Sequence, residues 1–227
     1  MRRICALMPD FPAGTAIQYQ SAGIAILGEI VQRVSGLPLR DFLRREIFDP
    51  LGMHDTALGM AGLPKERLSQ VNLPTEQVGT DWGWNSDYWR NLAAAWGGMF
   101  STAGDLTRYL QTFLNGGELD GVRVFSRATV AAMLRDQTTP MPAIPAEQKA
   151  IQSWGLGWRL ALATGSDWRY FGDLLTPGSF GHGGATGTVF WADPARETTF
   201  VLLTTQPAVW SEPLLGRSSN LAAASFT

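Results

Sequence analysis

The segment SFGHGGATGT, residues 179–188, is a candidate for chemistry because it combines His182 with four glycines. Glycines at this density indicate a backbone that a ligand or another segment approaches closely. A histidine beside such a backbone can donate, accept or transfer a proton near neutral pH. The alternative is a tight turn that contains a hydrogen-bonded histidine, and the residues alone leave both interpretations open. The other histidine, His54, lies in GMHDTALG, which is typical of a loop.

Tyr19 and Ser21 form a second candidate pair, just ahead of a helix predicted to begin near residue 21. The N-terminus of a helix can present polar side chains and backbone N–H groups to a cleft. The structural alternative is a half-buried packing tyrosine and a serine that caps the helix. Without a second motif to support a functional role, residue types alone favour that structural alternative.

The familiar patterns of activated nucleophiles are absent from the sequence. It contains no G-x-S-x-G, P-loop or H-E-x-x-H pattern, and its one cysteine, Cys5, has no histidine nearby. It contains no S-x-x-K, since neither Lys65 nor Lys149 has a serine three residues before it. Two histidines distant in sequence make no recognisable metal-ligand set, so we predict neither a metal nor a cofactor.

Apolar periodicity and caps mark the helices that would position these residues. Apolar side chains recur at helical spacing from Ile24 to Val34, and Gly36 follows where a left-handed C-cap is expected. Three more helices are predicted, over residues 39–48, 103–114 and 127–134. The second of these follows Thr102, which precedes Asp105 at the spacing of a capping box. The long stretch of residues 60–98 is predicted as loops, with one helical turn around residues 91–95.

Strand patterns follow a proline-rich linker around residues 140–145. Large apolar residues alternate with small or polar ones over residues 156–162, and TGTVFWAD and TTFVLLTT flank the turn DPARE. These patterns are typical of antiparallel strands. A last helix is predicted over residues 212–224.

We predict one domain over residues 1–227, of mixed α/β (α+β) class. Residues of about 20–150 would form a mainly helical part, and residues of about 151–227 would form the antiparallel strands and the terminal helix. The order of elements predicts an antiparallel sheet with helices packed on one face and a helical subdomain beside it.

Composition narrows the class of protein. The chain is 45% hydrophobic and 17% charged, with a formal net charge of −2, which predicts a soluble packed globule. Scattered arginines make nucleic acid an unexpected partner. No apolar run approaches the ~20 residues that would cross a bilayer. The apolar run in the opening MRRICALMPDF is too short for a signal peptide. The sequence does not fix the cellular compartment, and it slightly favours the cytoplasm.

Three long stretches carry a family resemblance. The first stretch runs from FPAGTAIQYQSAG to IFDPLGMHDT. The second is WGGMFSTAGDLTRYLQTFLNGG, and the third is SFGHGGATGTVFWADPARETTFVLLTT. In order and wording they resemble the serine β-lactamases of class C, the penicillin-binding proteins and the family VIII esterases. The resemblance covers residues 10–206 and implies a β-lactamase/DD-peptidase-like fold.

The resemblance implies roles for both candidate segments. Tyr19-Gln20-Ser21 falls on the family's Tyr-x-Asn motif, with Ser21 in place of the Asn. Tyr19 would then be the catalytic tyrosine that moves protons between the nucleophile and the leaving group.

The segment SFGHGGATGT falls on the family's third motif, Lys-Thr-Gly, through His182-Gly183-Gly184. The backbone N–H of Ala185 would supply one half of the oxyanion hole. His182 in place of the lysine removes a permanent cation that would hold the carboxylate of a β-lactam. The resemblance therefore favours a small ester over a β-lactam-like substrate.

The family's first motif, Ser-x-x-Lys, normally precedes the tyrosine motif by several tens of residues, and only eighteen residues precede Tyr19. We therefore expect an N-terminally truncated chain that lacks the nucleophile and its lysine. Ser21 is the candidate for a substitute nucleophile. The missing helix would run through the middle of the fold, so we expect uncovered apolar faces, and an oligomer or a partner segment that covers them.

Three hypotheses about function stay open. The first is a serine hydrolase that acts through an acyl-enzyme on an ester or a β-lactam-like substrate. The second is a non-catalytic binding or interaction protein that uses the same cleft. The third is a structural remnant that neither binds nor turns over a substrate.

Overall fold

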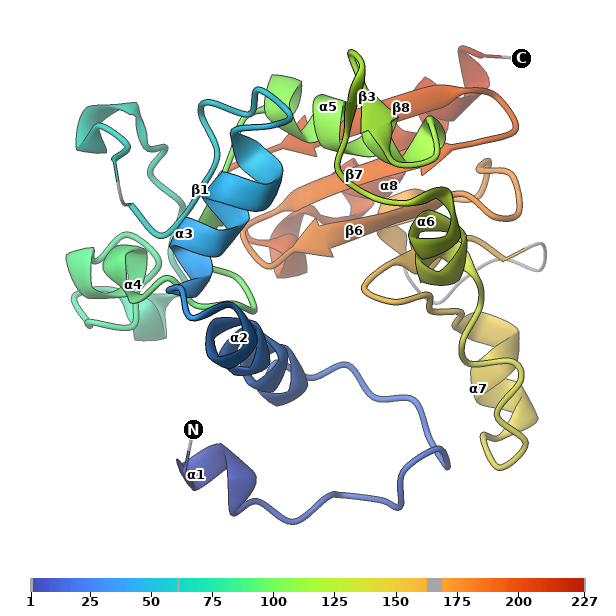
Figure 1. The fold of residues 1–227 in the computed structure, drawn as a ribbon, viewed down its shortest axis with the longest axis horizontal. Coiled ribbons are helices and arrows are strands. Elements are labelled where there is room, and N and C mark those ends of the chain that lie inside the picture. The colour runs from blue at the N-terminus through green and yellow to red at the C-terminus, as the bar shows by residue number, and fades with distance from the viewer. Residues whose placement is uncertain (1, 61, 163–168, 227) are drawn as a thin grey trace.

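An antiparallel four-stranded sheet organises the C-terminal part of the chain (Figure 1). The structure, a computed structural model, describes residues 2–60, 62–162 and 169–226. The strands β5 (Arg159–Leu160), β6 (Phe180–Gly184), β7 (Thr188–Asp193) and β8 (Thr198–Leu203) pair in chain order. The predicted antiparallel strands are thus confirmed. β5 is shorter than its sequence pattern, because Leu156 is exposed while Trp158 and Leu160 are buried.

Side chains of β7 alternate between two apolar cores, one on each face of the sheet. Val189 and Trp191 pack on the side of α8 (Ala208–Ala224) with Leu215. The other face packs against α5 (Ala103–Leu114), in a cluster that contains Leu110, Phe113, Trp158, Phe180 and Ala192. The two helices lie on opposite sides of the sheet in Figure 1. The prediction of helices on one face was therefore wrong, because α8 covers the second face.

The predicted helix after Ser21 is confirmed as α2 (Ala22–Ser35). Gly36 takes the left-handed conformation, φ 72°, and its N–H donates to the Gln32 carbonyl. The next predicted helix is α3 (Leu39–Leu43), which continues into the π-helical turn η1 (Arg44–Phe48). Phe48 at the end of this turn enters a third apolar cluster with Leu51, Met53 and Leu119.

The apolar face of α2 points away from the described core. Leu27 is 57% exposed and Val34 is 84% exposed, and Ile24 and Ile30 are also exposed. The helix buries its small residues instead, Ala25 and Gly28. Uncovered apolar faces were expected without a prediction of the element that carries them, and α2 exposes one such face.

The predicted cap of α5 is present, although it is half of a capping box. Thr102 Oγ1 accepts a hydrogen bond from the Asp105 N–H at 3.2 Å. The Asp105 carboxylate accepts instead from the Asp55 N–H at 2.9 Å and from Thr56 Oγ1 at 2.7 Å. The start of α5 is therefore tied to the loop that follows η1. A similar serine cap, at Ser126, begins α6 (Arg127–Leu134).

Shorter elements complete the described chain. They are α1 (Arg2–Cys5), β1 (Ala57–Leu58), η2 (Lys65–Arg67), η3 (Thr75–Gln77), α4 (Asp87–Leu92), β2 (Met99–Phe100), β3 (Glu118–Leu119), β4 (Val122–Arg123), α7 (Ala146–Ile151) and η4 (Arg169–Phe171). The predicted helical turn at residues 91–95 was misplaced, because Ser86 caps α4 and Ala93 ends it in the left-handed conformation. The proline-rich linker hides α7, which begins directly after Pro145. α8 begins earlier than predicted, at Ala208.

Bilayer-spanning helices were also sought among the described residues. No single helix there combines the length and apolar composition that crossing a bilayer requires. α2 together with α3 and η1 meets both criteria as a pair, with a 76° bend between them.

Gly187 closes the turn between β6 and β7, and its replacement tests how tightly this turn is packed. Its φ is 83°, and an added Cβ would collide with the Gln206 carbonyl oxygen and with Thr204 Oγ1. Gly178 has a similar φ of 89° but open space around the Cβ position. We expect Gly178→Ala to lose about 1–2 kcal/mol of unfolding free energy from backbone strain alone. Gly187→Ala should lose clearly more unfolding free energy, which urea unfolding of both variants measures. Equal losses in the two variants would contradict the close packing around Gly187.

Candidate functional site

A cavity of about 540 Å³ lies where the segment before α2 meets the end of β6. It brings together predicted site residues from opposite ends of the sequence, Tyr19 with His182, Gly183, Gly184 and Ala185. Its remaining lining residues are Ile17, Gln18, Gln152, Trp154, Arg159 and Tyr170. A second cavity, of about 320 Å³, lies beside α2 and contains none of the predicted site residues.

The hairpin of β6 and β7 positions the third-motif residues. His182 pairs with Phe190 across the two strands, and Gly184 pairs with Thr188 at the last register position. A Cβ on Gly181 would collide with backbone atoms of β7, so glycine is required where the strands approach this closely. A Cβ on Gly184 would collide with Thr188 Oγ1. The glycines predicted to permit close approach thus accommodate the neighbouring strand.

His182 is half-buried at the wall of the cavity, and its ring is anchored to its own strand. Nδ1 lies 3.0 Å from the Gly183 nitrogen and 2.7 Å from the Gly183 oxygen, so the tautomer decides whether Nδ1 accepts or donates. Burial lowers the pKa of His182 below its ordinary 6.5, and the positive charge of Arg159 lowers it further, while the hydrogen bond to Gly183 opposes both. The ring is therefore favoured as a neutral imidazole at pH 7.

Tyr19 stands at the opposite wall of the cavity, and its side chain is 65% exposed. Its ring centroid lies 6.2 Å from that of His182. The segment that carries it makes a wide loop between α1 and α2 that passes near α7 (Figure 1). There the Ile17 N–H donates to Gln148 Oε1 at 2.8 Å. This hydrogen bond ties the segment to α7 just before Tyr19.

Six of the residues that line the cavity were not predicted from the sequence, and Trp154 and Arg159 are two of them. The Trp154 ring centroid lies 6.3 Å from that of Tyr19 and 5.9 Å from that of His182. The Arg159 guanidinium lies 5.0 Å from the Trp154 centroid. Because Arg159 falls between the alternating Trp158 and Leu160, the sequence pattern indicates a solvent-facing arginine and contains no signal of its burial.

Ser21 lies near the site but is not among the residues that line the cavity. Its carbonyl accepts the Ala25 N–H at the start of α2, while its side chain makes no cap hydrogen bond. Gln20 Oε1 takes that role and accepts from the Gly23 N–H at 2.6 Å. The predicted serine cap was therefore wrong in the residue that supplies the side chain.

The clustered tryptophans and the second histidine lie elsewhere. The tryptophans of residues 82–96 are absent from the lining of this cavity, and Trp82 packs edge-on against Tyr88 and Trp89. His54 is exposed in a loop. No group of three or more metal-ligating side chains occurs among the described residues.

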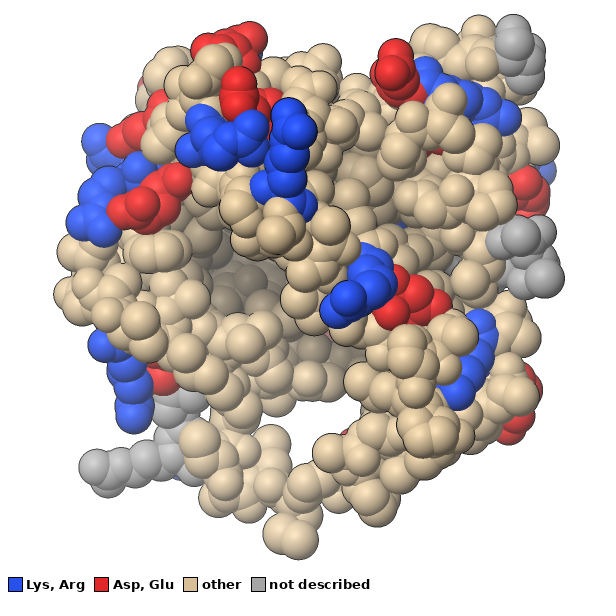
Figure 2. All heavy atoms as spheres, turned by 45° about the vertical axis from the view of Figure 1, so that its right-hand side comes forward, with Lys and Arg blue, Asp and Glu red and all other residues tan. Residues whose placement is uncertain are grey.

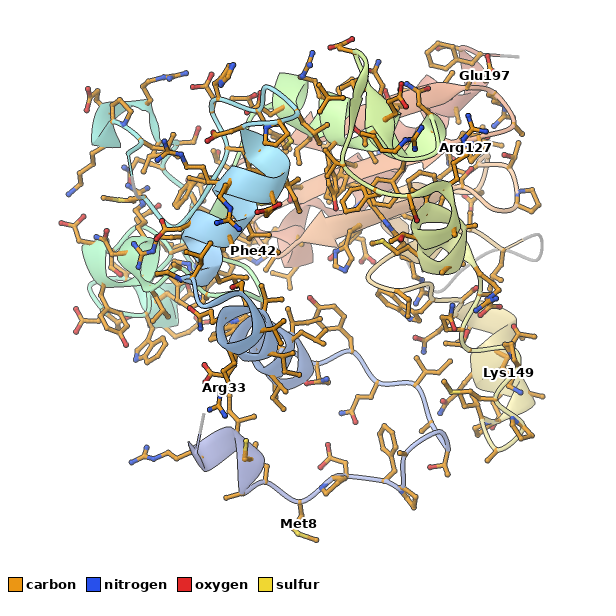
Figure 3. All side chains as sticks on the ribbon, in the orientation of Figure 1. Met8, Arg33, Phe42, Arg127, Lys149 and Glu197 are labelled. Atoms are coloured by element: carbon orange, nitrogen blue, oxygen red, sulfur yellow. The ribbon has the colours of Figure 1, made fainter. Side chains whose placement is uncertain are left out.

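The surface around this region is mixed in charge. Figure 2 shows a hollowed face on which basic and acidic side chains lie next to one another in small mixed groups. In Figure 3, Lys149 projects from α7 and Arg33 from α2, while Met8 points away from the body of the chain. The cavity lining itself contains one formally charged side chain among the described residues, Arg159.

Comparison with known proteins agrees with this fold. The sequence profile of the Beta-lactamase family matches residues 1–223, so the chain belongs to the β-lactamase family. An Escherichia coli (strain K12) protein named "Putative D-alanyl-D-alanine carboxypeptidase" is 30% identical over 218 residues, which are 87% of this chain and 47% of that protein. The chain thus spans about half the length of the curated relatives it matches.

Solved structures share the fold. A penicillin-binding protein homolog from Caulobacter crescentus has a TM-score of 0.72 at 24% identity, over 98% of this chain and 64% of that one. EstCE1, a hydrolase with promiscuous acyltransferase activity, has a TM-score of 0.65 at 19% identity, over 91% of this chain and 56% of that one. The predicted resemblance to the β-lactamase and penicillin-binding-protein family is confirmed.

The lowered pKa of His182 predicts a pH dependence of stability. Because the folded state disfavours the protonated ring, the contribution is complete above the ordinary pKa of 6.5 and is lost as pH falls through the lower folded pKa. The slope for one proton is at most about 1.4 kcal/mol per pH unit. Urea unfolding between pH 7 and pH 5 should show this loss in the wild-type chain.

The matched variants are His182→Gln and His54→Gln. His182→Gln should remove the part of the slope that His182 contributes, so its unfolding free energy should fall less between pH 7 and pH 5 than that of the wild type. His54→Gln removes the exposed histidine and serves as the control. Identical slopes for the wild type and His182→Gln would contradict the buried, neutral ring.

Proposed function

We propose that the cavity is part of the active site of a serine-type acyl-transfer hydrolase that acts through an acyl-enzyme. The observation that carries this proposal is the meeting of Tyr19 with His182-Gly183-Gly184-Ala185 in one cavity. By the resemblance in sequence, these residues fall on the second and third motifs of the family. Their convergence supports a functional role over the structural alternatives of a packing tyrosine and a tight turn.

Each residue has a role that its position allows. The Tyr19 phenol, exposed to the cavity, would transfer a proton between the nucleophile and the leaving group. The neutral His182 ring faces it across the cavity and can accept or donate one hydrogen bond. Ala185 follows β6 at the rim, where its N–H would stabilise the negative charge that develops on the substrate carbonyl oxygen.

We propose that the nucleophile comes from a Ser-x-x-Lys segment that is not part of these 227 residues. Its proposed seat is the exposed apolar face of α2, formed by Ile24, Leu27, Ile30 and Val34. The face directly follows the tyrosine motif, so a helix packed there would lie beside Tyr19. Burying an exposed leucine contributes about 1.5–3 kcal/mol, which favours such packing. Ser21 is the alternative nucleophile within the chain.

Small esters are the proposed substrates. EstCE1, described as a hydrolase with promiscuous acyltransferase activity, supports acyl transfer on this fold. The preference for esters over β-lactams rested on the replacement of the motif's lysine by His182. That argument is weakened, because Arg159 supplies a buried positive charge to the same cavity. The E. coli relative's name makes hydrolysis of a D-alanyl-D-alanine peptide the second enzymatic candidate. The absence of S-x-x-K favours a third, a non-catalytic binding protein.

Intact mass after incubation with a fluorophosphonate tests where the nucleophile resides. The folded chain alone should give no covalent adduct and no ester hydrolysis, because it lacks a serine paired with a lysine. Ser21→Ala is the matched variant. An adduct on the wild-type chain that disappears in Ser21→Ala would overturn the proposal that the nucleophile lies outside the chain.

The complementary arm supplies the nucleophile. A segment that carries the family's Ser-x-x-Lys motif, expressed as a separate polypeptide, should bind the chain and produce both an adduct and ester hydrolysis. Leu27→Glu should abolish this gain by placing a charge on the apolar face of α2, whereas Val78→Glu, at an exposed loop position, should retain it. Ester binding without any gain in hydrolysis would favour the non-catalytic binding protein.

A further inference from the structure

Arg159 is a buried cation in the wall of the candidate site. Its residue is 2% exposed and lies on β5, where it pairs with Gly181, the neighbour of His182. Its guanidinium donates to Gln152 Oε1 at 3.2 Å and to the Ile151 carbonyl at 3.0 Å. Burial of a charge costs free energy, and a buried charge at the wall of a cavity is a candidate for a functional role.

The guanidinium and the two predicted catalytic residues share one contact, the ring of Trp154. Arg159 lies over this ring at 5.0 Å, a cation–π distance. The ring in turn lies within 6.3 Å of Tyr19 and 5.9 Å of His182, centroid to centroid. Three rings from three separate segments therefore meet in front of one buried charge.

Backbone pairing locks this arrangement in place. Trp154 and Arg159 form an isolated antiparallel bridge, and the Leu160 N–H donates to the Ser153 carbonyl. Trp154 is thus held beside β5 at both the backbone and the side chain. β5 is hydrogen-bonded to β6, which carries His182, so the Trp154 ring is fixed relative to the imidazole.

We propose that Arg159 is a positioning residue whose guanidinium holds the Trp154 ring against Tyr19 and His182. Its importance for catalysis rests on the proposed acyl-transfer function, whereas the positioning itself does not. Arginine suits this role better than lysine, because its planar guanidinium stacks on an aromatic face and directs several hydrogen bonds at once.

The charge has a second effect on the same site. The groups that face His182 across the cavity are Tyr19, Tyr170 and Arg159, and the cavity lining contains no carboxylate among the described residues. Burial and the Glu212 charge both raise the pKa of Tyr170, so it stays uncharged near neutral pH. Arg159 is then the cation that opposes protonation of His182. A neutral imidazole retains one acceptor nitrogen, which an imidazolium lacks.

Nuclear magnetic resonance on the chain as it stands tests this role without any activity. The two histidines and the Trp154 indole give separate signals once His54→Gln and Trp154→Phe assign them. In Arg159→Gln, the pKa of His182 should rise toward its ordinary 6.5, and cross-relaxation from Trp154 to the Tyr19 and His182 rings should weaken. Arg159→Lys should keep the lowered pKa of His182 while losing part of the ring contacts.

Controls separate positioning from a general structural role. Arg127→Gln removes the same charge from an exposed site on α6 and should change neither readout. If Arg159→Gln fails to fold by circular dichroism, Arg159→Lys and Arg159→Met provide the comparison. An unchanged pKa of His182 together with unchanged ring contacts in a folded, uncharged variant would overturn the proposal. The nucleophile experiment is independent of this result, so failure of one leaves the other standing.

Discussion

The pairing of β6 between β5 and β7 is the constraint on which the site depends. It places His182 at the cavity wall, sets Arg159 beside Gly181, and ends in the turn that carries Ala185. This pairing requires glycine at position 181, because any Cβ would meet the backbone of β7. The two cores on either side of β7 then fix the sheet, with α5 on one face and α8 on the other. The third-motif half of the site thus follows directly on the buried residues Phe180 and Gly181 of β6.

The tyrosine half is attached by far fewer interactions. One hydrogen bond joins Ile17 to Gln148, and the ring contacts of Tyr19 with Trp154 and His182 span the cavity. α2 begins directly afterwards and exposes the apolar residues that would normally be buried in a helix of this pattern. The contrast in burial between the two halves explains why the proposed Ser-x-x-Lys segment belongs between them. The same segment would cover the apolar face of α2 and lie close to Tyr19.

Much of this arrangement could be predicted from sequence because local signals and a family resemblance agreed. The α2 helix with its Gly36 cap and the cap at Thr102 follow from local backbone chemistry, and the structure contains both. Tyr19 and His182 were paired through the resemblance, since no local signal relates residues so distant in sequence. The periodicity of α2 gave the helix but not its environment, because an apolar face looks the same whether a core covers it or not.

Features that depend on tertiary contacts escaped prediction. Arg159 and Trp154 acquire their roles only when β5 pairs with β6, and polar residues between alternating apolar ones are ordinarily solvent-facing. The start of α7 was hidden by prolines, although proline at a helix start is compatible with helical geometry. Asp105 does not complete the capping box, and its carboxylate accepts hydrogen bonds from Asp55 and Thr56, which are distant in sequence.

The central claim is that the tyrosine motif and the third motif form one site in this chain. The most direct measurement is the nuclear Overhauser effect between the ring protons of Tyr19 and His182 in solution, with Tyr19→Leu as the blank. The account predicts a cross-peak between the two rings, as their centroids lie 6.2 Å apart. A folded chain without this cross-peak would contradict the account, because the two motifs would then not meet in a common cavity.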